Sequence, residues 1–291
     1  MLASVLASNG INTVKVEAAA SPFNQLLAAE VSKGLMAAKS SFDIEVEHVP
    51  IEVDGISRVR MAKKGNAGDK VLFGFHGNGG HKLDLLSYSM HFVEKGFVVY
   101  LLDIIVYGEH SRLRALPRTT YLEQAGADLI NFIEITDACG KTVKLLDTFL
   151  NRPEFESSKI GVYGFSMGGV MSVRSLIGCR KIATACPMMG TGQLGQLGAD
   201  ATLFGKINTF LKESDPFADI PKLAAKPMLV QFGQKDPFVP VEAVKSMMEA
   251  SQAAYEKTGV PFELRFLPDV GHSVVPELFD NAGVWFQRFL G

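Results

Sequence analysis

The chain alternates between short apolar segments and segments with helical spacing from about residue 42 to its end, and this alternation restricts its fold more than any other feature. Residues 70–77, 97–104 and 159–165 are nearly continuous apolar runs, which is typical of strands buried on both faces. Each run is followed by a helix-like segment. Strands that alternate with helices predict an α/β fold, with a mostly parallel, twisted sheet and helices on both faces.

The first two expected strands are of a different kind. Residues 42–53 and 57–64 alternate apolar and polar side chains with period two, and Asp54-Gly55 between them is a hairpin signal. The sheet should therefore start antiparallel and continue parallel. The other strands are expected at 181–189, 226–233 and 262–268, and the helices at 82–96, 121–150, 168–178, 241–255 and 278–289.

Residues 1–40 precede this pattern. Ser21-Pro22 is a favourable N-cap and first helical residue, and it opens an amphipathic helix through Leu27, Val31 and Leu35. We expect an N-terminal extension that packs on a single domain of residues 41–291. A helix that binds a partner is the alternative.

Residues 187–226 interrupt the alternation inside that domain. The segment is rich in glycine, methionine and leucine at its start, and its apolar residues exceed what a solvated loop carries. Because the glycines permit wide backbone excursions, we expect an inserted lid. Residues 190–195 also spell G-x-G-x-x-G. A dinucleotide site would require a helix to open there and an acidic residue after the next strand, and the residues that follow do not fit.

Composition excludes several classes of function. The net charge is −2 with scattered Lys and Arg, so no nucleic-acid partner is expected. No apolar run reaches about 18 residues, so no membrane span is expected, and the start lacks the basic region of a signal peptide. The three cysteines have no metal-ligand spacing, which favours a reducing, cytoplasmic location without a bound metal. A homo-oligomer remains open.

The segment Gly164-x-Ser166-x-Gly168 lies between an expected strand and an expected helix. In that context G-x-S-x-G indicates a sharp turn that presents a nucleophilic hydroxyl. Glycines suit the flanking positions because helix and strand approach too closely there for side chains. The alternative is a turn that merely contains serine, and partners elsewhere in the chain must decide.

Two candidate partners follow later strands. Asp236 comes after the strand expected at 226–233, and His272 after the one at 262–268. An imidazole would take the Ser166 proton, and a carboxylate would fix the tautomer of that imidazole. The chain order Ser, Asp, His is that of α/β-hydrolases. The rival acids are Asp215, Asp219 and Asp269.

A loop at residues 75–80, FHGNGG, follows another strand. Ester cleavage creates an oxyanion that fixed N–H groups must stabilise. One donor should be the N–H of Met167, the residue after the nucleophile, and the second should be that of Asn78, with Gly79 as the alternative. His76 should shape this loop.

These motifs together resemble α/β-hydrolases, and most closely the bacterial carboxylesterases related to dienelactone hydrolases and to the catalytic domain of prolyl oligopeptidases. The resemblance implies an α/β-hydrolase fold, Ser166, Asp236 and His272 as a triad, and no metal or organic cofactor. The sequence departs from the family after Asp103, where an apolar IIVY replaces a glycine-containing pattern, so the substrate's shape is left open. The matching segments are 75–80, 101–111, 161–169, 232–240 and 268–273.

We therefore expect a serine carboxylesterase that cleaves small short-chain esters through an acyl-enzyme. The expected pocket residues are His81, Met188, Met189 and Phe204, and the bulk of the last three favours short acyl groups. A surface position suits His81 equally well, and ordinary core positions suit the methionines. The alternative functions are a prolyl-oligopeptidase-like peptidase or amidase, and a non-catalytic receptor or binding module with the hydrolase fold.

Overall fold

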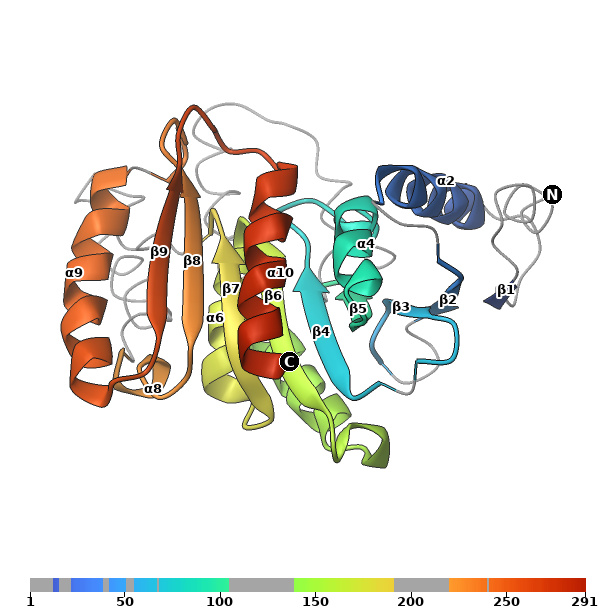
Figure 1. Cartoon of the computed structure of the whole chain (residues 1–291), viewed down its shortest axis with the longest axis horizontal. Helices are drawn as coiled ribbons and strands as arrows, with labels where there is room; N and C mark the ends of the chain where they lie inside the picture. Colours follow the sequence, from blue (N-terminus) through green and yellow to red (C-terminus); the bar gives the residue numbers. More distant parts are fainter. Residues whose placement is uncertain are drawn as a thin grey trace, which may run out of the picture.

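One twisted sheet organises the part of the chain that the structure, a computed structural model, describes: residues 13–15, 22–38, 42–50, 55–66, 68–104, 139–190, 220–239 and 241–291. Nine strands within these ranges lie in the order β1-β2-β3-β5-β4-β6-β7-β8-β9 (Figure 1). Their bounds are β1 (Thr13–Lys15), β2 (Ile44–Val49), β3 (Arg58–Lys63), β4 (Lys70–Phe75), β5 (Val98–Leu102), β6 (Lys159–Phe165), β7 (Ile182–Met188), β8 (Met228–Gly233) and β9 (Phe262–Leu267).

The antiparallel pairing of the first two predicted strands and the parallel remainder of the sheet are confirmed. β1, which the sequence did not predict, adds to β2 in parallel. β2 and β3 pair antiparallel, with Ile44 opposite Lys63 and Val49 opposite Arg58. β3 also pairs antiparallel with β5, and every pair from β5 through β9 is parallel. β8 is buried along its whole length, because helices cover both of its faces.

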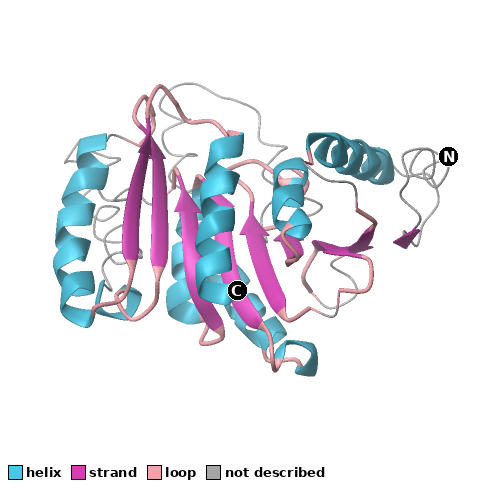
Figure 2. Ribbon diagram, viewed as in Figure 1, coloured by secondary structure: helices cyan, strands magenta, loops and turns pink. Residues whose placement is uncertain are grey.

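Helices form a layer on each face of the sheet (Figures 1 and 2). α4 and α10 lie on one face, with α2 packed outside α4, whereas helical residues 139–150, α6, α8 and α9 lie on the other. The helix bounds are α2 (Pro22–Ala37), α4 (Leu86–Glu94), α6 (Met167–Gly178), α8 (Ile220–Leu223), α9 (Val241–Thr258) and α10 (Pro276–Leu290), and Pro153–Phe155 form the 3-10 helix η3.

The apolar faces expected from helical spacing are buried where the structure describes them. Leu278, Ala282 and Trp285 of α10 belong to the core on its side of the sheet, and Phe289 packs at the edge of that core. α2 belongs to the same core through Leu27, Val31 and its contact with α4. The helix proposed for the N-terminal segment therefore covers part of the domain.

α4 begins later than its sequence pattern predicts. We expected helix from residue 82, but residues 82–85 form turns and the helix starts at Leu86. The Asp84 carboxylate accepts the His81 backbone N–H at 2.9 Å, and Leu86 N–H donates to Leu83 O at 3.0 Å. These local bonds compete with the first helical turn.

The strand order brings the ends of β4 and β6 together where the winding of the sheet reverses. The chain leaves β4 through α4 toward β5 on one side, and leaves β6 through α6 toward β7 on the other. α4 and α6 lie on opposite faces of the sheet, so the two exit loops diverge. Ligands in open α/β sheets bind at such a reversal point.

Candidate active site

Ser166 occupies the sharp turn between β6 and α6. Its backbone has φ 56° and ψ −118°, a conformation that residues with a side chain rarely adopt. The turn is held by the Ser166 N–H, which donates to Met188 O at 2.8 Å, and by Ser166 O, which accepts the Gly169 N–H at 2.8 Å. Strain of this kind persists only where the surrounding structure enforces it, and it is concentrated at functional sites.

Three glycines permit the close packing around this turn. A Cβ on Gly164 would collide with the Gly168 backbone, and one on Gly168 would collide with the backbone of Phe75. A Cβ on Gly190 would overlap the Ser166 carbonyl. Gly190 was expected to act as a lid hinge, but the structure gives it a steric role beside Ser166.

The structure brings Ser166, His272 and Asp236 into one hydrogen-bonded chain. His272 Nε2 lies 2.8 Å from Ser166 Oγ, and His272 Nδ1 lies 2.7 Å from Asp236 Oδ2. Since a carboxylate only accepts, Nδ1 carries the proton, and Nε2 is left to accept the serine hydroxyl. The Asp236 side chain is fully buried and that of His272 is 15% exposed. The arrangement can remove a proton from Ser166 when the hydroxyl attacks.

The turn after β8 orients the carboxylate of Asp236. Its Oδ1 accepts the backbone N–H groups of Phe238 at 2.8 Å and Val239 at 3.0 Å. Oδ2 therefore remains for His272. The rival Asp269 has an 80% exposed side chain and pairs with Lys235 at 2.6 Å. Asp215 and Asp219 lie outside the described residues.

The loop after β4 lies against Ser166. A Cβ on Gly77 would sit 3.6 Å from Ser166 Cβ. Asn78 and Gly79 follow at the surface of this loop. Across from them, Met167 is the first residue of α6, and the first N–H groups of a helix have no partner within the helix. The expected oxyanion donors are thus on the two segments that meet at Ser166.

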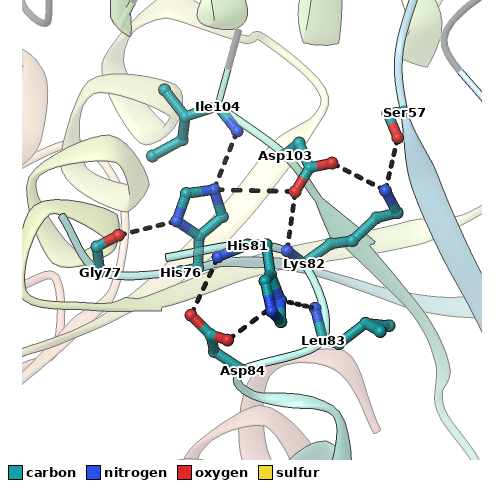
Figure 3. Close-up of polar contacts among 9 residues, drawn as sticks. All are labelled: Ser57, His76, Gly77, His81, Lys82, Leu83, Asp84, Asp103 and Ile104. Atoms are coloured by element: carbon teal, nitrogen blue, oxygen red, sulfur yellow. Dashed lines mark hydrogen bonds and ion pairs between the residues drawn. The ribbon is translucent and has the colours of Figure 1, made fainter. Parts of the chain in front are cut away.

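His76 ties the loop after β4 to the end of β5. Its Nδ1 donates to Gly77 O at 2.7 Å, and its Nε2 accepts the Ile104 N–H at 3.1 Å (Figure 3). Burial lowers the pKa of His76, although the Gly77 hydrogen bond and the Asp103 charge oppose this shift. A neutral ring suits both contacts, because Nε2 can accept only without a proton.

A buried ion pair next to this loop was missed by the sequence analysis. Lys82 Nζ lies 2.7 Å from Asp103 Oδ2 and 2.7 Å from Ser57 Oγ, and the Lys82 side chain is 1% exposed (Figure 3). Lys82 falls at the start of a segment with helical spacing, where lysine is ordinarily solvated, so its spacing gave no sign of burial. Asp103 lies at the end of β5, at the same edge of the sheet as Ser166.

The expected pocket residues occupy different environments. His81 Nδ1 lies 3.0 Å from Asp84 Oδ1, and its side chain is 29% exposed. Met188 and Met189 have no exposed surface and pack in the core that also contains Leu229 and Leu278, so they are core residues in the structure. Phe204 lies outside the described residues, as do 191–219 of the expected lid.

An exposed aromatic side chain adjoins the hydrogen-bonded chain. The rings of Phe165 and Phe238 each lie 5.1 Å from the His272 ring, measured between centroids. Phe238 is 66% exposed. It lies on the turn that orients Asp236, so one short segment supplies the acid and an apolar surface beside the imidazole.

A cavity lies apart from Ser166, Asp236 and His272, and the described ranges contain neither a candidate metal site nor a candidate membrane span. A cavity of about 340 Å³ is lined by residues of β2, β3 and β5, including Arg58, Arg60 and Tyr100, and by none of the triad residues. In the ranges described above, no group of His, Cys, Asp and Glu side chains could hold a metal ion. No helix in the same ranges is both long and apolar enough to cross a membrane.

Comparisons with known proteins identify the family of this chain and support its fold. The sequence profile of the dienelactone hydrolase family matches residues 59–279. A search of curated proteins found no significant match. A solved structure of TT1662 from Thermus thermophilus has a TM-score of 0.67 and 17% identity, covering 85% of this chain and 98% of that chain. An esterase of Pyrococcus furiosus has a TM-score of 0.56 and 20% identity, covering 95% of this chain and 98% of that one.

A peptidase structure is similar over part of its length. An acylaminoacyl peptidase of Pyrococcus horikoshii has a TM-score of 0.60 and 15% identity, covering 89% of this chain but 44% of that chain. At such identities these structures support the α/β-hydrolase fold and leave the reaction to be argued from the site.

Proposed function

The chain belongs to the dienelactone hydrolase family, and from that premise we propose that it is a serine carboxylesterase that cleaves small esters through an acyl-enzyme. The family and fold already make it a hydrolase of the α/β-hydrolase class. The observation that carries the finer proposal is the 2.8 Å contact between His272 Nε2 and Ser166 Oγ, completed by Asp236 on Nδ1. A base in direct contact is what an unactivated hydroxyl needs in order to attack a carbonyl.

In the proposed acylation step, Ser166 Oγ attacks the ester carbonyl while His272 Nε2 takes its proton. The resulting tetrahedral intermediate carries an oxyanion, which the N–H groups of Met167 and Asn78, or Gly79 in place of Asn78, would stabilise. His272 then gives the proton to the leaving alkoxide, and the C–O bond breaks. Asp236 stabilises the imidazolium throughout and fixes its orientation.

Deacylation reverses these roles with water as the nucleophile. His272 removes a proton from water, the hydroxide attacks the acyl carbonyl, and Ser166 leaves with the returned proton. Each turnover converts one ester and one water into an acid and an alcohol. The attacking serine, the base and the N–H donors of this cycle belong to the chain itself.

The preference for short acyl groups rests on sequence alone. Residues 187–226 follow the strand after the nucleophile, and their bulk favours a short pocket. Because Met188 and Met189 pack in the core, Phe204 is the remaining pocket residue from this segment to be tested.

A panel of p-nitrophenyl esters of graded acyl length, run beside aminoacyl anilides, tests the proposed function. We expect turnover of acetyl to butyryl esters above that of long-chain esters and of anilides, and no turnover by Ser166→Ala. Phe204→Ala should shift the preference toward longer acyl groups. Faster anilide cleavage would favour the peptidase or amidase alternative, and a lack of any Ser166-dependent turnover would favour a binding module.

A further inference from the structure

The loop of residues 76–82 is attached at both of its ends to the same short segment, the end of β5. At its start, His76 Nε2 accepts the Ile104 N–H at 3.1 Å. At its other end, the backbone N–H of Lys82 donates to Asp103 Oδ1 at 2.7 Å, and Lys82 Nζ contacts Asp103 Oδ2 at 2.7 Å (Figure 3). Asp103 and Ile104, the two residues that follow β5, thus hold the loop that carries Asn78.

Asp103 is itself held firmly. Its backbone N–H donates to Ser57 O at 3.1 Å, while the Ser57 hydroxyl lies 2.7 Å from Lys82 Nζ. Ser57, Lys82 and Asp103 therefore all contact one another. Together they connect the residue before β3, the loop and the residue after β5. A buried ion pair is weak support for stability compared with apolar side chains of similar size, so its presence here suggests a role in position.

Peptide geometry connects these anchors to the proposed oxyanion site. In a trans peptide the carbonyl of Gly77 and the N–H of Asn78 point in opposite directions, and the described residues contain no cis peptide. Gly77 O accepts from His76 Nδ1 at 2.7 Å and from the Gly80 N–H at 3.1 Å. These two bonds fix the direction of the Asn78 N–H. A peptide that rotated or shifted would change the position of this donor relative to Ser166.

We propose that Lys82 and Asp103 are positioning residues, which hold the 76–82 loop so that its backbone N–H stabilises the oxyanion during ester cleavage. This inference rests on the proposed function and extends it to residues that do not touch the substrate. Removing one oxyanion donor reduces kcat by about 100- to 1000-fold, and a displaced donor retains part of its effect. We expect about 10- to 100-fold for loss of the ion pair.

The test compares Lys82→Met and Asp103→Asn with wild type on p-nitrophenyl acetate. Both variants should lose kcat by that factor while KM changes less than about threefold, because the bound ester does not yet carry the oxyanion. A trifluoromethyl ketone, which forms a tetrahedral adduct with the serine, should bind more weakly by the same factor as kcat. The double variant should be no worse than the poorer single variant, because the two residues act as a unit.

Lys226→Met is the matched control. The Lys226 ammonium is half-buried and donates to Leu176 O at 2.8 Å and Cys179 O at 3.0 Å, on the opposite side of the sheet from α4. Losing it removes buried charge contacts without touching the loop, so kcat and ketone affinity should change less than about threefold. If Lys82→Met fails to fold, Ser57→Ala removes one contact of Lys82 Nζ and should still lower kcat and ketone affinity together, by about threefold or more.

Several results would overturn the proposal. They are a rise in KM at constant kcat, an unchanged ketone affinity in the folded variants, or an equal loss of kcat in Lys226→Met. Failure of the proposed function is seen separately, as wild-type turnover that does not depend on Ser166.

Discussion

The segments that follow β4 and β6 meet where the winding of the sheet reverses, and different interactions hold each of them in place. On the β6 side, Ser166 is fixed by backbone packing, with Gly164, Gly168 and Gly190 at contacts where a methyl group would collide. On the β4 side, the 76–82 loop is fixed by polar contacts, through His76, Lys82 and Asp103. The side proposed to hold the nucleophile should therefore be intolerant of added volume, and the side proposed to hold the oxyanion donors should be intolerant of lost polarity or altered charge.

Removing a group that takes part in the proposed proton transfer should lower kcat more than loosening either of the two segments does. Asp236→Asn tests this. The amide would no longer support the correct tautomer of His272, so kcat should fall by about 10⁴ while the fold is retained. The measurement is kcat on p-nitrophenyl acetate, with circular dichroism as the check on folding.

Asp269→Asn is the control for that variant. Its side chain is exposed and pairs with Lys235 rather than His272, so kcat should change less than about threefold. A crippled Asp269→Asn beside an active Asp236→Asn would reverse the assignment of the acid.

Adding one methyl group to the nucleophile side gives the next largest effect. Gly190→Ala places a Cβ against the Ser166 carbonyl, and overpacking of this kind lowers the free energy of unfolding by about 1–3 kcal/mol. Because the displaced group is the nucleophile's own backbone, turnover should fall as well. Denaturant unfolding and kcat measure the two effects.

Gly140→Ala is the matched comparison. Gly140 lies in a helix, and a Cβ at this position would meet open space, so alanine should be neutral or stabilise by up to about 1 kcal/mol. Equal destabilisation by the two substitutions would mean that close packing does not hold the nucleophile turn.

The contrast between the two sides also explains what the sequence could reveal. Glycine spacing around Ser166, and the acid and histidine after later strands, follow from local pattern and strand order. The fold class was predicted for the same reason, since apolar runs and helical spacing are local properties. The structure brings Ser166, Asp236 and His272 together, and their catalytic roles stay a proposal.

The polar side depends on contacts between distant segments, which no local pattern encodes. Lys82 was expected on an ordinary helix start, and its pairing with Asp103 and Ser57 depends on how three strands assemble. Met188 and Met189 show the same limit, because apolar residues suit a pocket and a core equally well by sequence. The structure shows that both methionines belong to the core on the side of the sheet that α4 and α10 cover.

Phe238 lies on the turn after β8, outside both segments, and its exposed ring tests a third kind of contact with the substrate. His272 must reach the leaving-group oxygen, so the alcohol portion of an ester should lie near the adjacent Phe238 ring. Phe238→Ala should lower kcat/KM for phenyl or naphthyl acetate by about five- to tenfold, through lost apolar contact, and for ethyl acetate by less than about twofold.

Val284→Ala controls for loss of an exposed apolar side chain elsewhere. Val284 is 60% exposed on α10, and its loss should leave both classes of ester unchanged. An equal loss for aryl and alkyl esters in Phe238→Ala would show that the ring does not contact the leaving group.

The smallest expected effect concerns pH and the polar side. The pKa of buried His76 is lowered from 6.5, so as pH falls below about 6.5 the unfolded chain gains a proton that the folded chain does not. Stability is therefore lost from pH 6.5 down to the lowered pKa, with a slope of up to about 1.4 kcal/mol per pH unit. The charges facing His76 are those of Asp103, Asp84 and His81.

His76→Asn keeps a donor for Gly77 O and removes the titration. Its free energy of unfolding should depend less on pH than that of wild type over this window, as measured by urea unfolding at several pH values. A wild-type slope in His76→Asn would show that His76 does not titrate in this way.

The most direct test of the account is the site of covalent labelling by a fluorophosphonate. The reagent reacts with a serine only when a neighbouring base activates it. Peptide mass mapping should find one adduct, on Ser166, which disappears in Ser166→Ala and forms far more slowly in His272→Gln. An adduct on a different serine, or labelling that persists in Ser166→Ala, would contradict the proposal that Ser166 is the nucleophile.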